Sequence, residues 1–194
     1  VGRVANKLGL TGLQISEGGA RIFDPKNNQT HWLRCLKPDD ARRILQFLEK
    51  YALPYTAVQK INQVNVCDIR DVTCWQITRV TATSLTESQA RDIAENFNKD
   101  EVHAVIILRI DNGDWMVDFT NFKATKSTAV KNYAAINQLH TSQIIGAGDS
   151  YNDLPLLEAC GLRIAMGNGT PELKAIADYV APEVDQDGLA VAIE

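Results

Sequence analysis

The last third of the chain alternates short apolar segments with segments of helical pattern, and this alternation limits the possible fold more than any other feature. The apolar segments, each the length of a strand, lie at 142–147, 162–166 and 179–181. The helical segments around them lie at 126–139, 154–159, 171–177 and 188–194. Because strands that alternate with helices form parallel sheets, this part is predicted to be a parallel α/β layer.

The middle of the chain, from about residue 24 to residue 120, has the pattern of helices packed on an antiparallel sheet. A helix is expected to begin at Pro38, and Thr86-Glu-Ser-Gln89 has the form of a capping box at the start of a second helix. Residues 75–83 alternate with period two, which is typical of a half-buried strand. Asp-Asn-Gly-Asp at 111–114 predicts a hairpin turn between two further strands.

The first residues show a helical pattern over 1–8, with Gly9 at a position typical of a helix end. A short strand is predicted at 13–16, followed by a tight turn with two glycines, Glu17-Gly18-Gly19-Ala20. No capping residue precedes the first helix, so the pattern begins within a helix.

Composition excludes several classes of protein. The 194 residues carry 24 acidic and 20 basic side chains, a net charge of −4, which argues against coating nucleic acid or an anionic membrane. No apolar run reaches the ~18 residues that span a bilayer. The four cysteines lack Cys-x-x-Cys spacing and only three histidines are present, so we expect reduced thiols, no zinc site and a cytoplasmic protein.

The chemically most informative stretch is Gly148-Asp149-Ser150-Tyr151-Asn152-Asp153, which follows an apolar strand and leads into a helix. Ligands of open α/β sheets bind at the carboxyl ends of the strands. Two carboxylates four positions apart across such a turn suit Mg²⁺, which prefers oxygen ligands. The simpler alternative is a helix cap, in which Asp149 or Asn152 only satisfies free backbone N–H groups.

This stretch resembles the fourth motif of the haloacid dehalogenase superfamily, where Gly-Asp-x-x-x-Asp or Gly-Asp-x-x-Asn-Asp supplies carboxylates for Mg²⁺. The segments that follow it, at 158–174, 177–180 and 187–190, are similar to the Cof-type phosphatases of that superfamily. The likeness is specific over 126–194. The turn that contains Gly18 and Gly19 resembles the family's Glu-Asn-Gly-Ala turn, with Gly18 in place of asparagine.

The resemblance implies an α/β fold with a parallel-sheet, Rossmann-like haloacid dehalogenase core and an inserted α+β cap domain. Residues 1–23 would be the first part of the core, residues 24–120 the cap and residues 121–194 the second part of the core. In the family the cap covers the catalytic cleft and selects the substrate.

Lys126 stands where the family has a lysine that pairs with phosphate, with Ser127 in place of the usual glycine. A lysine at a helix start opposes the helix dipole, which favours an anionic partner for its side chain. A solvated surface lysine is the simpler alternative, and Lys123 is the alternative in a shifted register.

The family mechanism also uses an aspartate nucleophile in an Asp-x-Asp-Gly element at the end of the first strand. The matching letters here, Asp185-Gln-Asp187-Gly188, do not directly follow an apolar strand, so we reject them as the nucleophile. A sheet without its central strands would leave unpaired backbone groups, so we expect about 40 to 50 further residues before Val1. We expect the 194 residues alone to be inactive.

The function that the resemblance implies is Mg²⁺-dependent hydrolysis of a small phosphorylated metabolite, a sugar phosphate or a phosphoglycolate-like ester, through an aspartyl-phosphate. Asp149 and Asp153 would hold the metal, Lys126 would neutralise phosphate charge, and Asn152 with the turn at Gly18 and Gly19 would contact substrate. We expect a monomer or homodimer without nucleic-acid or membrane partners.

Two alternatives belong to other classes. The first is a non-catalytic module of this fold that binds phosphate or a partner protein. The second is the phosphorylation domain of a cation-pumping ATPase, which shares a Gly-Asp-x-x-Asn-Asp segment. That class also needs an Asp-Lys-Thr-Gly-Thr element, and this chain lacks one.

Overall fold

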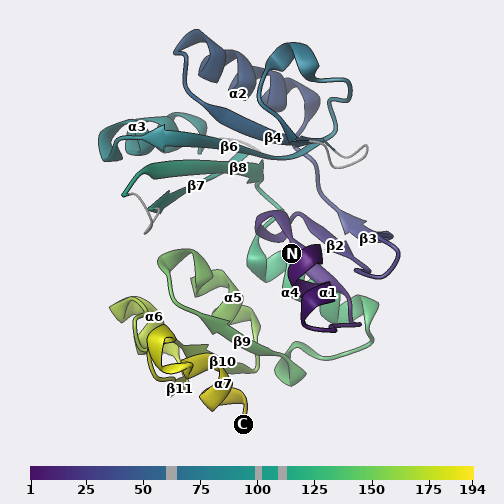
Figure 1. Ribbon diagram of the computed structural model, residues 1–194, viewed down its shortest axis with the longest axis vertical. Helices are drawn as coiled ribbons and strands as arrows, with labels where there is room; N and C mark the ends of the chain where they lie inside the picture. The colour runs from purple at the N-terminus through teal and green to yellow at the C-terminus, as the bar shows by residue number, and fades with distance from the viewer. Residues whose placement is uncertain (60–64, 99–101, 109–112) are drawn as a thin grey trace. The chain divides into compact units, whose positions relative to one another are not determined.

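The structure is a computed structural model that describes residues 1–59, 65–98, 102–108 and 113–194 (Figure 1). The chain divides into two compact units, unit 1 from Val1 to Ala124 and unit 2 from Thr125 to Glu194. Each unit is described by itself. Across the described ranges, every helix is too short or too polar to pass through a lipid bilayer.

Unit 1 contains a five-stranded antiparallel sheet with the strand order β5-β4-β6-β8-β7. Its strands are β4 (Tyr55–Gln59), β5 (Asn65–Val66), β6 (Ile77–Leu85), β7 (Val102–Leu108) and β8 (Trp115–Asn121). The antiparallel pairing of β7 with β8 confirms the two strands expected around the hairpin. Residues 111 and 112 of the expected turn lie outside the described residues.

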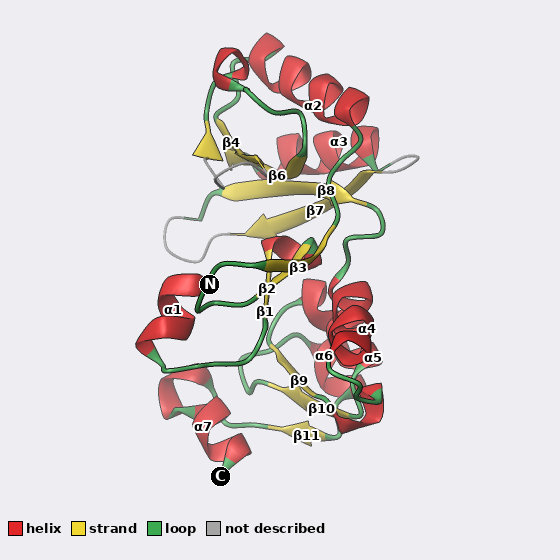
Figure 2. Cartoon of the chain, turned by 90° about the vertical axis from the view of Figure 1, so that its right-hand side faces the viewer, coloured by secondary structure: helices red, strands yellow, loops and turns green. Residues whose placement is uncertain are grey.

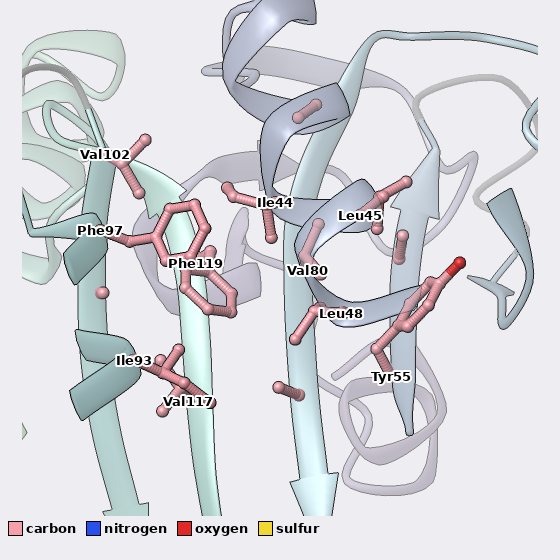
Figure 3. Close-up of a cluster of buried hydrophobic side chains, with 14 of the residues drawn as sticks. Ile44, Leu45, Leu48, Tyr55, Val80, Ile93, Phe97, Val102, Val117 and Phe119 are labelled. Atoms are coloured by element: carbon pink, nitrogen blue, oxygen red, sulfur yellow. The ribbon is translucent and has the colours of Figure 1, made fainter. Parts of the chain in front are cut away.

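Two helices, α2 (Pro38–Lys50) and α3 (Glu87–Phe97), cover one face of this sheet, and the main core lies between them and the strands (Figure 3). The Phe97 ring meets the Phe119 ring edge-on at 5.4 Å between centroids. The expected capping box is confirmed, since the Thr86 N–H donates to the Gln89 side chain at 2.9 Å and the Gln89 N–H donates to the Thr86 hydroxyl at 3.2 Å. The antiparallel pattern read from the sequence is therefore confirmed for this part.

A smaller antiparallel sheet in unit 1 follows a short first helix. It consists of β1 (Gln14–Ser16), β2 (Arg21–Phe23) and β3 (Thr30–Leu33), and the helix is α1 (Gly2–Lys7). The 3₁₀ turn Glu17–Gly19 joins β1 to β2 and has positive φ at all three residues, 56°, 66° and 104°. The two glycines adopt such angles freely, whereas Glu17 adopts them at a steric cost.

Unit 2 is the parallel α/β layer that the alternation of strands and helices predicted. Its sheet has the order β11-β10-β9, formed by β9 (Ile145–Gly148), β10 (Leu162–Ala165) and β11 (Tyr179–Val180). The helices are α4 (Lys126–Ile136), α5 (Leu154–Ala159), α6 (Pro171–Ile176) and α7 (Gly188–Ile193). Figure 2 shows α4, α5 and α6 on one side of the sheet and α7 on the other.

The two faces of the parallel sheet carry separate small cores. Ala165 of β10 packs with Leu157 of α5 and Leu173 of α6, while the preceding residue, Ile164, packs on the opposite face beside Ala192 of α7. Consecutive strand residues point to opposite faces of the sheet. A parallel strand that is buried on both faces therefore needs apolar side chains at its odd-numbered and its even-numbered positions. This explains why the consecutive residues 164–166 are all apolar and buried.

The buried side of α4 differs from the expected one. The sequence pattern predicts Ala129, Tyr133, Ala134 and Ile136 on that side, but Val130 is buried and Ile136 is 38 % exposed. Residue 136 lies seven positions after the buried Ala129, on nearly the same side of a helix of 3.6 residues per turn, so its exposure depends on what packs on this last residue of α4 and not on helix periodicity.

Candidate active site

The Gly-Asp-Ser-Tyr-Asn-Asp stretch forms a sharp turn at the carboxyl end of β9. Asp149 directly follows the strand, and a 3₁₀ turn, Tyr151–Asp153, leads into α5. The sequence pattern predicts Asn152 and Asp153 in the first turn of this helix, but they lie in the 3₁₀ turn before it. The turn ends there because Pro155 favours the first turn of the α-helix that follows.

Asp153 is buried, and one of its carboxylate oxygens closes the turn. Oδ2 accepts hydrogen bonds from the backbone N–H of Asp149 at 3.2 Å, the backbone N–H of Ser150 at 3.3 Å and the Ser150 hydroxyl at 3.2 Å. A side chain at position 148 would place its Cβ 2.5 Å from the Asp153 Cβ, so the close approach requires glycine there. A carboxylate thus satisfies free N–H groups here, but it is that of Asp153 and not of Asp149 or Asn152, the residues that the helix-cap alternative named.

The other oxygen of Asp153 faces Lys126, which is the first residue of α4. The Lys126 ammonium pairs with Asp153 Oδ1 and donates a second hydrogen bond to Asn152 Oδ1 at 3.3 Å. The residue before the lysine, Thr125, caps the helix by accepting from the Thr128 N–H at 3.1 Å. The structure therefore brings three residues together. Lys126 precedes Asn152 by 26 positions and Asp153 by 27 in the sequence.

The pKa of Asp153 is the net result of opposed effects. Burial by itself raises the pKa of this carboxyl group. The hydrogen bond and charge of Lys126, together with the N–H groups of Ser150 and Asp149, outweigh burial and lower the pKa below the ordinary value. The carboxylate is therefore ionised at neutral pH and forms a true ion pair with the ammonium.

Asp149 has a different environment. Its side chain is exposed, and no hydrogen bond or ion pair joins its carboxylate to any of the residues that the structure describes. Its backbone carbonyl accepts from the Thr170 N–H at 3.1 Å, and the Thr170 hydroxyl is buried with no hydrogen-bond partner. Asp149 reaches Asp153 through its backbone N–H, so its carboxylate is free of the bonds that hold the carboxylate of Asp153.

The donor set suits a magnesium ion with few protein ligands. Within the described ranges, no three carboxylate, histidine or cysteine side chains gather in a way that could hold a metal. Mg²⁺ commonly binds through one or two carboxylates and keeps several waters. An exposed carboxylate such as that of Asp149, in the same turn as a second carboxylate already held by donors, fits that pattern.

Sequence reasoning missed Ser150 and Thr170. The Ser150 hydroxyl lies 2.6 Å from Asn152 Oδ1 as well as bonding to Asp153, so it holds both acceptors in place. Its position inside the turn was a usable signal, because serine commonly bonds backbone and side chains in such loops. Nothing in the sequence pattern pointed to Thr170, which reaches Asp149 only through the packing of β10 beside β9.

The remaining candidate residues are not part of this turn. Gly18 and Gly19 belong to the 3₁₀ turn of unit 1, whereas Lys126, Asp149, Asn152 and Asp153 belong to unit 2. Lys123, the register alternative, is exposed with its ammonium 5.3 Å from the centre of the Phe122 ring. The rejected Asp185-Gln-Asp187 stretch is an exposed 3₁₀ turn before α7, four residues after the end of β11, which agrees with its rejection.

Curated relatives with similar sequences include several phosphatases. The chain is 26 % identical over 155 residues to a phosphoglycolate phosphatase of Methanothermobacter thermautotrophicus, an alignment that covers 80 % of this chain and 65 % of the relative. It is 33 % identical over 88 residues to phosphatase YwpJ of Bacillus subtilis, covering 45 % of this chain and 31 % of the relative. The chain thus spans less than two thirds of the length of either protein.

Solved structures share the fold over almost the whole chain. A haloacid dehalogenase-like hydrolase from Bacillus subtilis matches with a TM-score of 0.80 at 20 % identity, covering 97 % of this chain and 80 % of that one. The subclass IIB sugar phosphatase BT4131 matches with a TM-score of 0.77 at 18 % identity, covering 98 % and 78 %. At these identities the likeness establishes the fold, an α/β core of Rossmann-like type with a cap.

A family model described as haloacid dehalogenase-like hydrolase matches residues 58–193, which is well over half of the chain. The match includes the whole turn at Asp149–Asp153 and the lysine at the start of α4. The chain therefore belongs to the haloacid dehalogenase-like hydrolases.

Proposed function

We propose that the protein is a Mg²⁺-dependent phosphomonoester hydrolase that acts on a small phosphorylated metabolite, a sugar phosphate or a phosphoglycolate-like ester. The observation that carries the proposal is the Lys126–Asp153 ion pair at the carboxyl end of a parallel strand, beside the exposed Asp149 carboxylate. The similarity to a phosphoglycolate phosphatase and to a sugar phosphatase supports the substrate class.

In this proposal each side chain of the turn has a separate task. Asp149 would hold the metal ion directly, while Asp153, whose oxygens are already engaged, would act on it through water. A bound Mg²⁺ supplies charge neutralisation to the phosphoryl oxygens. The Lys126 ammonium would pair with the same phosphoryl group, and Asn152 and Asp153 would hold it in position.

The reaction would proceed through an aspartyl-phosphate. A carboxylate oxygen attacks phosphorus while the ester P–O bond breaks, and a second carboxyl group gives its proton to the departing alcohol. That second group then takes a proton from water as the water attacks phosphorus and releases phosphate. We propose that both aspartates lie outside these 194 residues, because no strand of the described residues leads directly into an Asp-x-Asp-Gly element.

The test is turnover of a panel of phosphate esters by the full-length protein with and without Mg²⁺. Asp149→Ala should abolish both turnover and metal dependence, while the matched control Asp185→Ala should behave as wild type. Lys126→Met should reduce kcat/KM by about a hundredfold or more, as expected for removing a charge that faces the transferring phosphoryl group, and Lys131→Met on the exposed side of α4 should not. Retained turnover in Asp149→Ala would refute the metal assignment.

A second readout tests the metal site without turnover. Mn²⁺ added to this 194-residue chain should broaden the amide NMR signals of residues 149–153 and leave them sharp in Asp149→Ala. Broadening together with phosphate binding, but no turnover of any ester by the full-length protein, would indicate the non-catalytic binding module instead.

We also propose that the protein works in the cytoplasm as a monomer or homodimer. Cys67, Cys74 and Cys160 form no disulfide bond, which supports a reducing compartment.

A further inference from the structure

One loop of unit 2 bonds to the backbone on both sides of Asp149. The loop consists of residues 166–170, which connect the strand β10 to the helix α6. The Met166 N–H donates to the Gly148 carbonyl at 2.9 Å, and the Thr170 N–H donates to the Asp149 carbonyl at 3.1 Å. The loop therefore holds the peptide groups immediately before and immediately after the Cα of Asp149.

The other two polar groups of these peptides bond to Asp153. The Asp149 N–H and the Ser150 N–H both donate to Asp153 Oδ2, at 3.2 and 3.3 Å. Each peptide is planar, so the positions of the two peptides determine φ and ψ of the residue between them. The four hydrogen bonds thus fix the direction in which the Asp149 side chain leaves the backbone, and two of the four come from the loop 166–170.

The loop has close backbone contacts at its two glycines. A Cβ at position 167 would lie 2.8 Å from the Glu183 backbone nitrogen, and a Cβ at position 169 would lie 2.8 Å from the Met166 carbonyl oxygen. The Gly169 N–H donates to that same carbonyl at 2.8 Å. The loop is therefore a short closed turn, in which a displacement of Gly167 also displaces the residues on either side of it.

Lys174 of α6 holds this loop through its side chain. The partly buried ammonium donates to the Gly167 carbonyl at 2.6 Å, which is its only partner in the part of the chain that the structure describes. The loop has a second side-chain tie, from the Val184 N–H to Asn168 Oδ1 at 3.2 Å, between neutral groups. A hydrogen bond with a charged donor is roughly twice as strong as a neutral one, so Lys174 supplies the stronger restraint.

The contact of Lys174 is not explained by charge pairing. A lysine ammonium ordinarily stays in water or pairs with a carboxylate, because removing the charge from water is costly. Here the ammonium bonds to a neutral carbonyl instead. What this bond achieves is to fix the position of the loop.

We propose that Lys174 is a positioning residue for Asp149. Through the Gly167 carbonyl it holds the loop 166–170, and the loop directs the Asp149 carboxylate to the place where it would bind Mg²⁺. The inference rests on the proposed function, in which Asp149 holds the metal. It adds a residue of α6 that acts through the loop rather than by contact with metal or substrate.

The first measurement needs no metal. In the full-length protein, Lys174→Met keeps an unbranched side chain and removes the ammonium. Amide hydrogen exchange at Met166 and Thr170 should become about tenfold faster, as expected when a charged donor is lost, while the amides within β10 stay protected. Lys131→Met, at an exposed lysine of α4, is the matched control and should exchange as the wild type does. Unchanged exchange at Met166 and Thr170 in folded Lys174→Met would overturn the inference.

The second measurement is the affinity of the full-length protein for Mn²⁺, read from the EPR signal of the free ion. Lys174→Met should raise the Kd about tenfold, an effect typical of removing a group that orients a metal ligand. Lys174→Arg, which keeps a charged donor, should bind as the wild type does. A residue that only stabilises the fold would change the number of binding sites and leave the Kd unaltered.

The results separate this inference from the proposed function. If the wild type binds Mn²⁺ and Lys174→Met binds it with the same Kd, the positioning role is wrong and the proposed function stands. If the wild type itself does not bind Mn²⁺, both are wrong. Lys174→Gln, which also removes the charge, takes the place of Lys174→Met if that variant does not fold, with the same expected changes.

Discussion

Asp153 shows how one side chain can be both a structural and a functional residue. One oxygen closes the turn after β9 through three donors, and the other pairs with Lys126. The helix-cap and active-site interpretations of this motif therefore do not exclude each other. The donors that close the turn hold the Asp153 carboxylate in the orientation in which Oδ1 pairs with the Lys126 ammonium.

The Lys126–Asp153 pair should make stability depend on pH in the acid range. Because the folded pKa of Asp153 lies below its ordinary value near 3.8, the pair stabilises fully above that value and loses its effect as the pH falls through the folded pKa. Asp153→Asn should cost about 2 kcal/mol at pH 7, typical of hydrogen bonds to a charged group, and less at pH 2. Urea unfolding at both pH values measures this, with Asp185→Asn as control; an equal loss at both would contradict it.

At the scale of elements, the geometry of the strand β9, the turn after it and the helix α5 depends on the close approach of Gly148 to Asp153. Gly148 ends the strand directly against Asp153, and its missing side chain leaves the only room for that carboxylate. The neighbouring Pro155 starts α5 and stops the 3₁₀ turn from extending. The site is thus built from local backbone geometry before any distant residue contributes.

Gly148→Ala should disrupt this element. The added Cβ, 2.5 Å from the Asp153 Cβ, forces the turn open, which should cost about 1–3 kcal/mol as overpacking does, and should abolish turnover in the full-length protein. Gly2→Ala is the matched control, since its Cβ would make only ordinary contacts at 3.8 Å with Phe23. Differential scanning calorimetry and the ester assay give the two measurements. Wild-type activity in Gly148→Ala would show that the turn tolerates the side chain.

At the scale of the whole molecule, stability is divided between cores that share no residues. The core of unit 1 joins α2 and α3 to the five-stranded sheet, and the two small cores of unit 2 lie on opposite faces of the parallel sheet. A substitution in one core should therefore act first on the unit that contains it.

Phe119→Ala tests this division. Removing a fully buried ring should destabilise unit 1 by about 3–5 kcal/mol, through lost burial and the cavity that is left. Amide hydrogen exchange should then speed up in β6 and β8 and stay slow in β9 and β10. The reciprocal variant Leu173→Ala should accelerate β9 and β10 and leave β6 and β8 protected. Equal acceleration in both units by either variant would show one cooperative core.

Local patterns in the sequence were enough for most elements. The capping box at Thr86, the proline start at Pro38 and the alternation from residue 142 onward all predicted elements that the structure confirms. Each of these signals acts within a few residues, through capping bonds, fixed φ angles or periodicity. The buried side of α4 was wrong at Ile136 because the burial of a helix face is decided by what packs on it.

For the site, the sequence by itself determined which residue types meet at the end of β9 and that a lysine begins α4. Only the tertiary structure decided that Lys126 reaches Asp153 rather than solvent, that Asp149 stays exposed and that Thr170 lies against it. Contacts of this kind depend on strand pairing and helix packing between segments far apart in the sequence, so no local sequence pattern predicts them.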